Sequence, residues 1–182
     1  MPELPEGLFA VIKKQFGTGC GVEMSNARLA TSYIHKSDHG PWTPAFVGDM
    51  DGDGSEDIVI VARCKDAVGG AAQFGYKVVD PVNSYYGWGD PKITTQFSVQ
   101  DPEKDLVLLI IHGSGKEGWR ADHPKVKFAF INLRFENVAL SGASLKKKPV
   151  AAIRLDEPDG VSSLLFFDGK KWKYAPGAAG GN

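Results

Sequence analysis

The chain lacks the segments that define several large functional classes. No apolar run approaches the roughly 20 residues of a membrane-spanning helix, so we expect no membrane insertion. The formal net charge is −1, and Lys146, Lys147 and Lys148 form the only basic run, so we expect no nucleic-acid partner. The N-terminal sequence lacks the basic start and apolar core of a signal peptide, although a chain whose leader had been removed would look the same.

Cysteine is also scarce, since Cys20 and Cys64 are the only two. They could form one disulfide, which would fit an oxidising compartment, or they could remain two buried thiols. The sequence leaves both alternatives open. Cys20 lies between two glycines, so its segment has the freedom to reach a strand end at Cys64.

What is present fits one globular unit. The 182 residues contain 42% hydrophobic and 24% charged residues, which is ordinary for a domain with a real core. We expect a single β-rich domain over residues 1–175, followed by a frayed glycine-rich and alanine-rich tail over residues 176–182. Oligomeric state does not follow from this composition.

The N-terminal segment predicts one amphipathic helix over residues 5–16. Leu8, Val11, Ile12 and Phe16 fall on one helical face, and Gly17 can end the helix. We expect this helix to pack against a sheet.

After residue 30 the pattern is one of short apolar runs separated by turn residues, which is typical of strands. The clearest hairpin covers residues 164–174, with Asp168 and Gly169 in its turn. We therefore predict a mostly β fold of antiparallel hairpins with one N-terminal helix. The predicted strands are 45–47, 58–63, 74–79, 93–99, 106–111, 126–132, 135–140, 150–155, 164–167 and 171–174.

The most informative segment is an acidic loop before the second of these strands. Its carboxylates are Asp49, Asp51, Asp53 and Asp57, which repel one another unless a cation gathers them. Oxygen-only ligands favour Ca²⁺, with the carbonyl oxygen of Ser55 as a fifth ligand. Glu56 is expected to point to solvent. The loop is not an EF-hand, because its twelfth position is Ile60 rather than glutamate.

The segment from Phe46 to Ala62 resembles the calcium-binding hairpin of FG-GAP (VCBS-type) repeats. Such repeats build integrin-like β-propellers and occur in many exported bacterial proteins. The resemblance implies the same five ligand residues, a structural ion, and a periplasmic or extracellular location, with a cytoplasmic one still open. Weaker acidic stretches before residues 105 and 163 are either decayed copies or ordinary acidic turns, and three unequal units would not close a propeller.

Other constellations carry weaker signals. Tyr85, Tyr86 and Trp88 lie in a segment rich in glycine and proline, which we expect to be a loop that either contacts a ligand or folds over the core. His35 and His39 have a spacing that could share a metal on a helix, but Gly40 and Pro41 favour a loop there.

Two functions stay open. The first is a non-enzymatic, calcium-stabilised module that binds an unknown protein or glycan. The alternative is a small hydrolase with a structural calcium ion, in which His112 or His123 would meet a carboxylate in a cleft. An open aromatic surface would favour the binding module.

Overall fold

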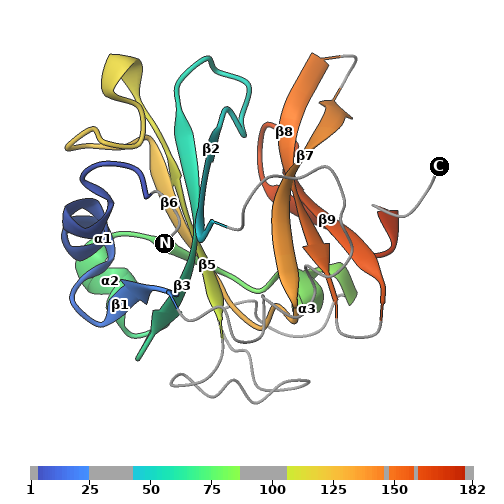
Figure 1. Ribbon diagram of the computed structural model, residues 1–182, viewed down its shortest axis with the longest axis horizontal. Helices are drawn as coiled ribbons and strands as arrows, with labels where there is room; N and C mark the ends of the chain where they lie inside the picture. Colours follow the sequence, from blue (N-terminus) through green and yellow to red (C-terminus); the bar gives the residue numbers. More distant parts are fainter. Residues whose placement is uncertain (1–3, 25–42, 87–105, 146–147, 158–159, 179–182) are drawn as a thin grey trace.

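The structure is a computed structural model that describes residues 4–24, 43–86, 106–145, 148–157 and 160–178. Within these ranges the chain forms ten β-strands in two sheets and three α-helices, which confirms the predicted mostly β fold. Figure 1 shows three layers, with α1 and α2 on one side, a six-stranded sheet in the middle and a four-stranded sheet on the other side.

The middle layer is built around two long apolar strands. Its strands are β1 (Cys20–Val22), β2 (Ala45–Gly48), β3 (Asp57–Cys64), β4 (Lys77–Val79), β5 (Val107–His112) and β6 (Val126–Phe130). The order is β1-β3-β5-β6-β4, and β2 pairs with the first half of β3 while β1 pairs with its second half. Only β4 runs parallel to its neighbour among the described strands, whereas the predicted pattern was antiparallel.

The outer sheet is an antiparallel meander of β7 (Asn137–Leu145), β8 (Lys148–Asp156), β9 (Ser162–Phe167) and β10 (Trp172–Ala175). The predicted last hairpin is confirmed, with Trp172 opposite Phe167. The Asp168 side chain accepts the backbone N–H groups of Lys170 and Lys171, and Gly169 adopts a φ of 93° in the same turn. This turn chemistry fixes the register of the hairpin.

The two faces of the middle sheet form two hydrophobic cores. Ile58 and Ile60 of β3 pack toward the helices, whereas Val59 and Val61 pack toward the outer sheet. Strand β5 alternates in the same way. Because β3 and β5 are covered on both faces, they read in the sequence as unbroken apolar runs rather than as alternating ones.

Helix α1 (Leu8–Phe16) covers one face of the middle sheet, as predicted, through Leu8, Ile12 and Phe16. It begins three residues later than expected because Gly7 takes a left-handed φ of 79°. Its end is as predicted, since the N–H of Gly17 bonds the Lys13 carbonyl at a φ of 87°.

Two short helices differ from the prediction. Helix α2 (Gly70–Phe74) ends where a strand was expected to begin, and only β4 remains of that strand. The predicted aromatic loop begins instead as helix α3 (Pro81–Tyr86), so the loop prediction was wrong for those residues. The carboxylate of Asp80 accepts the N–H of Asn83 at 3.0 Å and so caps α3. Helices of five or six residues are too short to show a helical periodicity.

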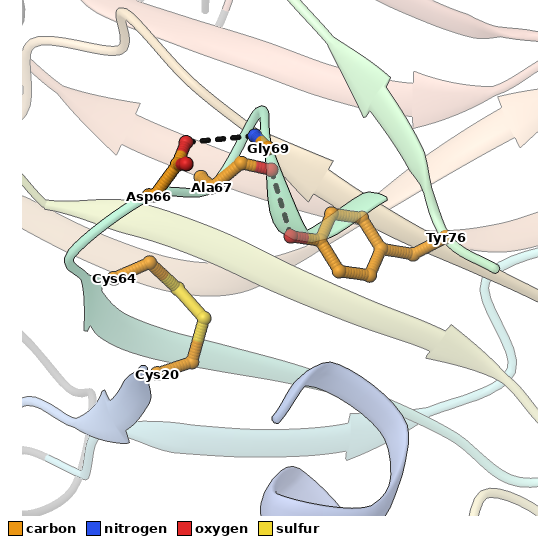
Figure 2. The surroundings of a disulfide bond; sticks show 6 residues. All are labelled: Cys20, Cys64, Asp66, Ala67, Gly69 and Tyr76. Carbon is orange, nitrogen blue, oxygen red and sulfur yellow. Dashed lines mark hydrogen bonds between the residues drawn. A yellow bond between two sulfur atoms is a disulfide. The ribbon is translucent and has the colours of Figure 1, made fainter. Parts of the chain in front are cut away.

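The disulfide alternative is the one that the structure contains. Cys20 of β1 lies directly opposite Cys64 of β3, and the two form a disulfide (Figure 2). The chain beyond Cys64 turns at once, where the Tyr76 hydroxyl donates to the Ala67 carbonyl at 2.7 Å. The disulfide therefore joins the three-residue edge strand β1 to the end of β3.

Some expectations lie outside the described residues, namely the strand over residues 93–99, the acidic stretch at 101–105, and Trp88, His35 and His39. Strands β3 and β5 pair with each other in one sheet, whereas equivalent strands of successive propeller blades would lie in separate sheets. In the described part of the chain, no helix has the length and apolar character needed to cross a bilayer.

Candidate metal centre

The acidic loop is the tip of the β2–β3 hairpin, in which Gly48 pairs with Asp57. The Asp49 carboxylate closes this loop by accepting three backbone N–H groups, from Gly52 at 2.7 Å, Asp53 at 3.2 Å and Gly54 at 2.9 Å. Gly52 and Gly54 adopt φ angles of 73° and 87°, which L side chains rarely take. The loop therefore winds around its own carboxylates.

This winding brings three predicted ligands together. One carboxylate oxygen each from Asp49, Asp51 and Asp53 lies within 4.8 Å of the others, so these residues could hold a metal ion. Ser55 lies in the same loop and donates its N–H to Asp53 at 2.7 Å. Its carbonyl stays a predicted ligand.

Asp57 has a different position from the other three carboxylates. It is fully buried, and its two oxygens accept the N–H groups of Met50 at 2.8 Å and Gly113 at 2.7 Å. Burial raises the pKa of Asp57 to about 7, and the negative charges of Asp51 and Asp49 add to that effect. The side chain ties the loop to the end of β5, and it groups with Asp51 and His112 rather than with Asp49 and Asp53.

His112 is the one residue of that second group that could offer a nitrogen to a metal ion. It is the last residue of β5 and is fully buried, with Nδ1 3.2 Å from the Asp51 carboxylate. Its ring contacts three aromatic rings edge-on or nearly so, those of Phe128, Phe167 and Trp172, with centroids 5.4, 4.9 and 5.6 Å away. Burial lowers the pKa of His112, while Asp51 opposes this shift. Its Nε2 has no hydrogen-bond partner among the described residues.

A lysine completes the cluster. The Lys125 ammonium lies 2.6 Å from the Asp51 carboxylate and 2.8 Å from that of Asp53. The hydrogen bond from Lys125 is the main reason that the pKa of Asp53 lies below its usual value, and the two carboxylates in turn raise the pKa of Lys125. Nearly half of the lysine side chain is exposed, so a competing cation can displace it without unpacking the core.

Sequence reasoning did not place His112 or Lys125 at this loop. The signal that could have placed them is strand register, because Ile58 pairs with Ile111 and His112 pairs with Val126. Asp57 precedes Ile58, His112 follows Ile111, and Lys125 precedes Val126. The three residues therefore meet at one end of three neighbouring strands. Such a register depends on contacts far apart in the chain.

Glu56 is exposed, as predicted, but it contributes more than long-range charge. Its carboxylate accepts a hydrogen bond from the indole of Trp119 at 2.8 Å and pairs with Arg120 at 2.9 Å. Trp119 is fully buried, so this carboxylate satisfies an indole N–H that has left water. A side chain at Gly113 or Gly118 would collide with the Glu56 backbone, which explains the glycines of that connection.

The predicted aromatic residues lie elsewhere, at the end of α3. Tyr85 and Tyr86 are 54% and 50% exposed, and Tyr85 packs edge-on against Tyr174 of β10. Tyr85 also lines a cleft of about 1030 Å³, which we call the β4–β10 cleft. It is lined by residues of α2, β4, α3, β6, β9, β10 and the β9–β10 turn.

Comparison with protein-family models, with curated proteins and with solved structures finds no match to this chain. Its function must therefore be argued from the site itself.

Proposed function

We propose that the protein is an exported, calcium-stabilised binding module without enzymatic activity. The observation that carries the proposal is the cluster of Asp49, Asp51 and Asp53, whose oxygens lie within 4.8 Å of one another at a hairpin tip. Oxygen ligands suit a hard cation, and a loop that wraps around its ion suits calcium better than magnesium, which usually retains several waters.

The surroundings of the cluster support a structural role for the ion. Asp57 anchors the loop to Gly113, directly after β5, and Glu56 anchors it to Trp119. An ion that held Asp49, Asp51 and Asp53 would therefore fix the tip of a hairpin whose base is already part of the core. The ammonium of Lys125 neutralises part of this negative charge.

The burial of His112 favours a binding module over a hydrolase. His112 does meet a carboxylate, that of Asp51, as the hydrolase alternative required, but the histidine is fully buried among aromatic rings. A general base must come within hydrogen-bond reach of a substrate. The other candidate histidine, His123, is exposed. The carboxylate next to it in the sequence, that of Asp122, pairs with Lys14 instead. The open β4–β10 cleft offers a surface for a ligand instead.

Two features support export. The Cys20–Cys64 disulfide fits an oxidising compartment. The loop resembles FG-GAP repeats, which occur in many exported bacterial proteins.

Thermal unfolding in calcium and in excess chelator tests the metal part of this proposal. At a calcium concentration a hundredfold above Kd, we expect a stabilisation of about 2.7 kcal/mol, seen as a higher melting temperature, whereas magnesium at the same concentration should give less. Elemental analysis of the dialysed protein should find about one calcium ion per chain.

The matched variants are Asp53→Asn and Glu117→Gln. Asp53→Asn removes one ligand charge but keeps an oxygen that can accept the Ser55 N–H, so it should reduce the calcium response while changing the melting temperature in chelator little. Glu117→Gln removes an exposed charge outside the loop and should behave as the wild type. An equal response to calcium in all three proteins would rule out the assigned ligands.

A further inference from the structure

We infer that the β4–β10 cleft binds a small organic anion with a flat aromatic body, an inference that rests on the proposed binding role. The cleft lies apart from the acidic loop, and none of Asp49, Asp51, Asp53 or Asp57 lines it. Its volume of about 1030 Å³ is at the upper end of the range for small-molecule sites, so a ligand of several rings fits.

The inner wall of the cleft is apolar and rigid. Phe128 and Trp172, 7% and 8% exposed, present small parts of packed rings to the cleft, and Phe167 lies beside them. The rings of Phe128 and Phe167 also pack on the buried ring of His112, so they cannot turn freely. A flat aromatic body can stack on or pack edge-on against such rings.

The rim of the cleft carries charge of one sign. Lys77, Lys170, Lys171 and Lys173 line it, and no aspartate or glutamate lines it among the described residues. The side chains of Lys77, Lys170 and Lys171 have no carboxylate oxygen within 4 Å in the described part of the chain, whereas Lys173 lies 3.8 Å from Asp168. Four lysines on one cleft contrast with a whole chain of net charge −1. The cleft therefore favours an anion.

Two tyrosine hydroxyls of the cleft already donate within the chain, that of Tyr76 to the Ala67 carbonyl and that of Tyr174 to Glu157. The lysine ammonium groups are therefore the charged donors that the cleft offers to a ligand. An aromatic carboxylate, sulfonate or phosphate needs only an apolar wall and cationic donors, which this cleft combines.

A matched pair of fluorescent probes tests this inference on the intact, calcium-saturated chain. Anilinonaphthalene sulfonate carries an aromatic body and one negative charge, and N-phenylnaphthylamine carries the same body without the charge. We expect saturable binding of the sulfonate at one site. The Lys170→Gln, Lys171→Gln double variant should weaken its binding by about tenfold at low ionic strength and change the neutral probe by less than about twofold.

Two controls locate the effect. Lys65→Gln with Lys116→Gln removes two exposed lysines that do not line the cleft, and it should leave both probes unchanged. Ala72→Trp fills the mouth of the cleft from an exposed helical position and should weaken both probes, whereas Ala10→Trp on the exposed face of α1 should weaken neither. A sulfonate affinity that falls equally in both lysine pairs, or that survives Ala72→Trp, would overturn the inference.

This experiment separates the inference from the calcium site. Sulfonate binding that is lost on Ala72→Trp would support the cleft even if calcium did not raise the melting temperature. A normal calcium response without saturable sulfonate binding would overturn the cleft assignment and leave the calcium site standing. Binding of the chain only to vesicles of anionic phospholipid, with neither soluble probe bound, would also overturn it.

Discussion

The acidic loop and the β4–β10 cleft use charge in opposite ways. In the loop, four carboxylates accept hydrogen bonds from the chain itself, as Asp49 does from three backbone N–H groups. In the cleft, lysines stand at the rim of an apolar wall and find few partners in the chain. The charged groups of the loop are therefore satisfied within the chain, whereas those of the cleft are available to a ligand.

This difference gives the charges of the two regions different roles, in stability for the loop and in ligand binding for the cleft. Groups that satisfy one another stabilise the folded state, and their loss should appear as a change in the free energy of unfolding. Exposed charges without close partners contribute little to stability, and their loss should appear in the affinity for a ligand. His112 lies between the two regions, since its Nδ1 meets Asp51 and its ring packs on the aromatic wall of the cleft.

The largest effect is expected from Asp57→Ala. The substitution leaves the buried N–H groups of Met50 and Gly113 without an acceptor, so we expect a loss of about 3 kcal/mol in the free energy of unfolding. The loss should be present in calcium and in chelator, because these hydrogen bonds do not need an ion. Urea unfolding in both buffers measures it.

Asp57→Asn is the matched control for this prediction. The amide keeps one oxygen acceptor, so about half of the loss should remain. A loss below 1 kcal/mol for Asp57→Ala would contradict the closed character of the loop.

A smaller effect is expected from Lys125→Met, which should strengthen calcium binding rather than lower stability. The change removes a cation that competes for the carboxylates of Asp51 and Asp53 while it keeps most of the apolar stem. We expect calcium to bind about tenfold more tightly, a gain of about 1.4 kcal/mol. Isothermal titration calorimetry measures the affinity, and Lys116→Met controls for the loss of an exposed lysine. An unchanged calcium affinity would show that the ion does not occupy the place of the ammonium.

The sequence predicted those parts of the fold that depend on local pattern. The apolar runs of β3 and β5, the amphipathic face of α1 and the Asp168–Gly169 hairpin all carry their signal within a few residues. Helices α2 and α3 escaped prediction because five or six residues show no period, and α3 depends on the cap from Asp80.

The candidate site was predictable only in part, for a related reason. The spacing of Asp49, Asp51, Asp53 and Asp57 indicated a metal loop, but spacing does not say which carboxylate turns into the core. That choice depends on Gly113, 56 residues away from Asp57. The presence of His112 and Lys125 follows from the register of β3, β5 and β6, which a single sequence does not determine.

The smallest effect on the free energy of unfolding is expected from the double variant that removes two lysine charges from the cleft. In the hairpin turn, Lys170 and Lys171 bond to Asp168 through their backbone N–H groups, which Lys170→Gln and Lys171→Gln leave in place. We therefore expect the double variant to change the free energy of unfolding by less than about 0.5 kcal/mol, measured by urea unfolding beside Asp57→Ala. A loss above 1 kcal/mol would mean that these side chains hold the turn together, and the contrast between a closed loop and an open cleft would fail. Unchanged stability with a weakened affinity for the anionic probe would assign the lysines to recognition alone.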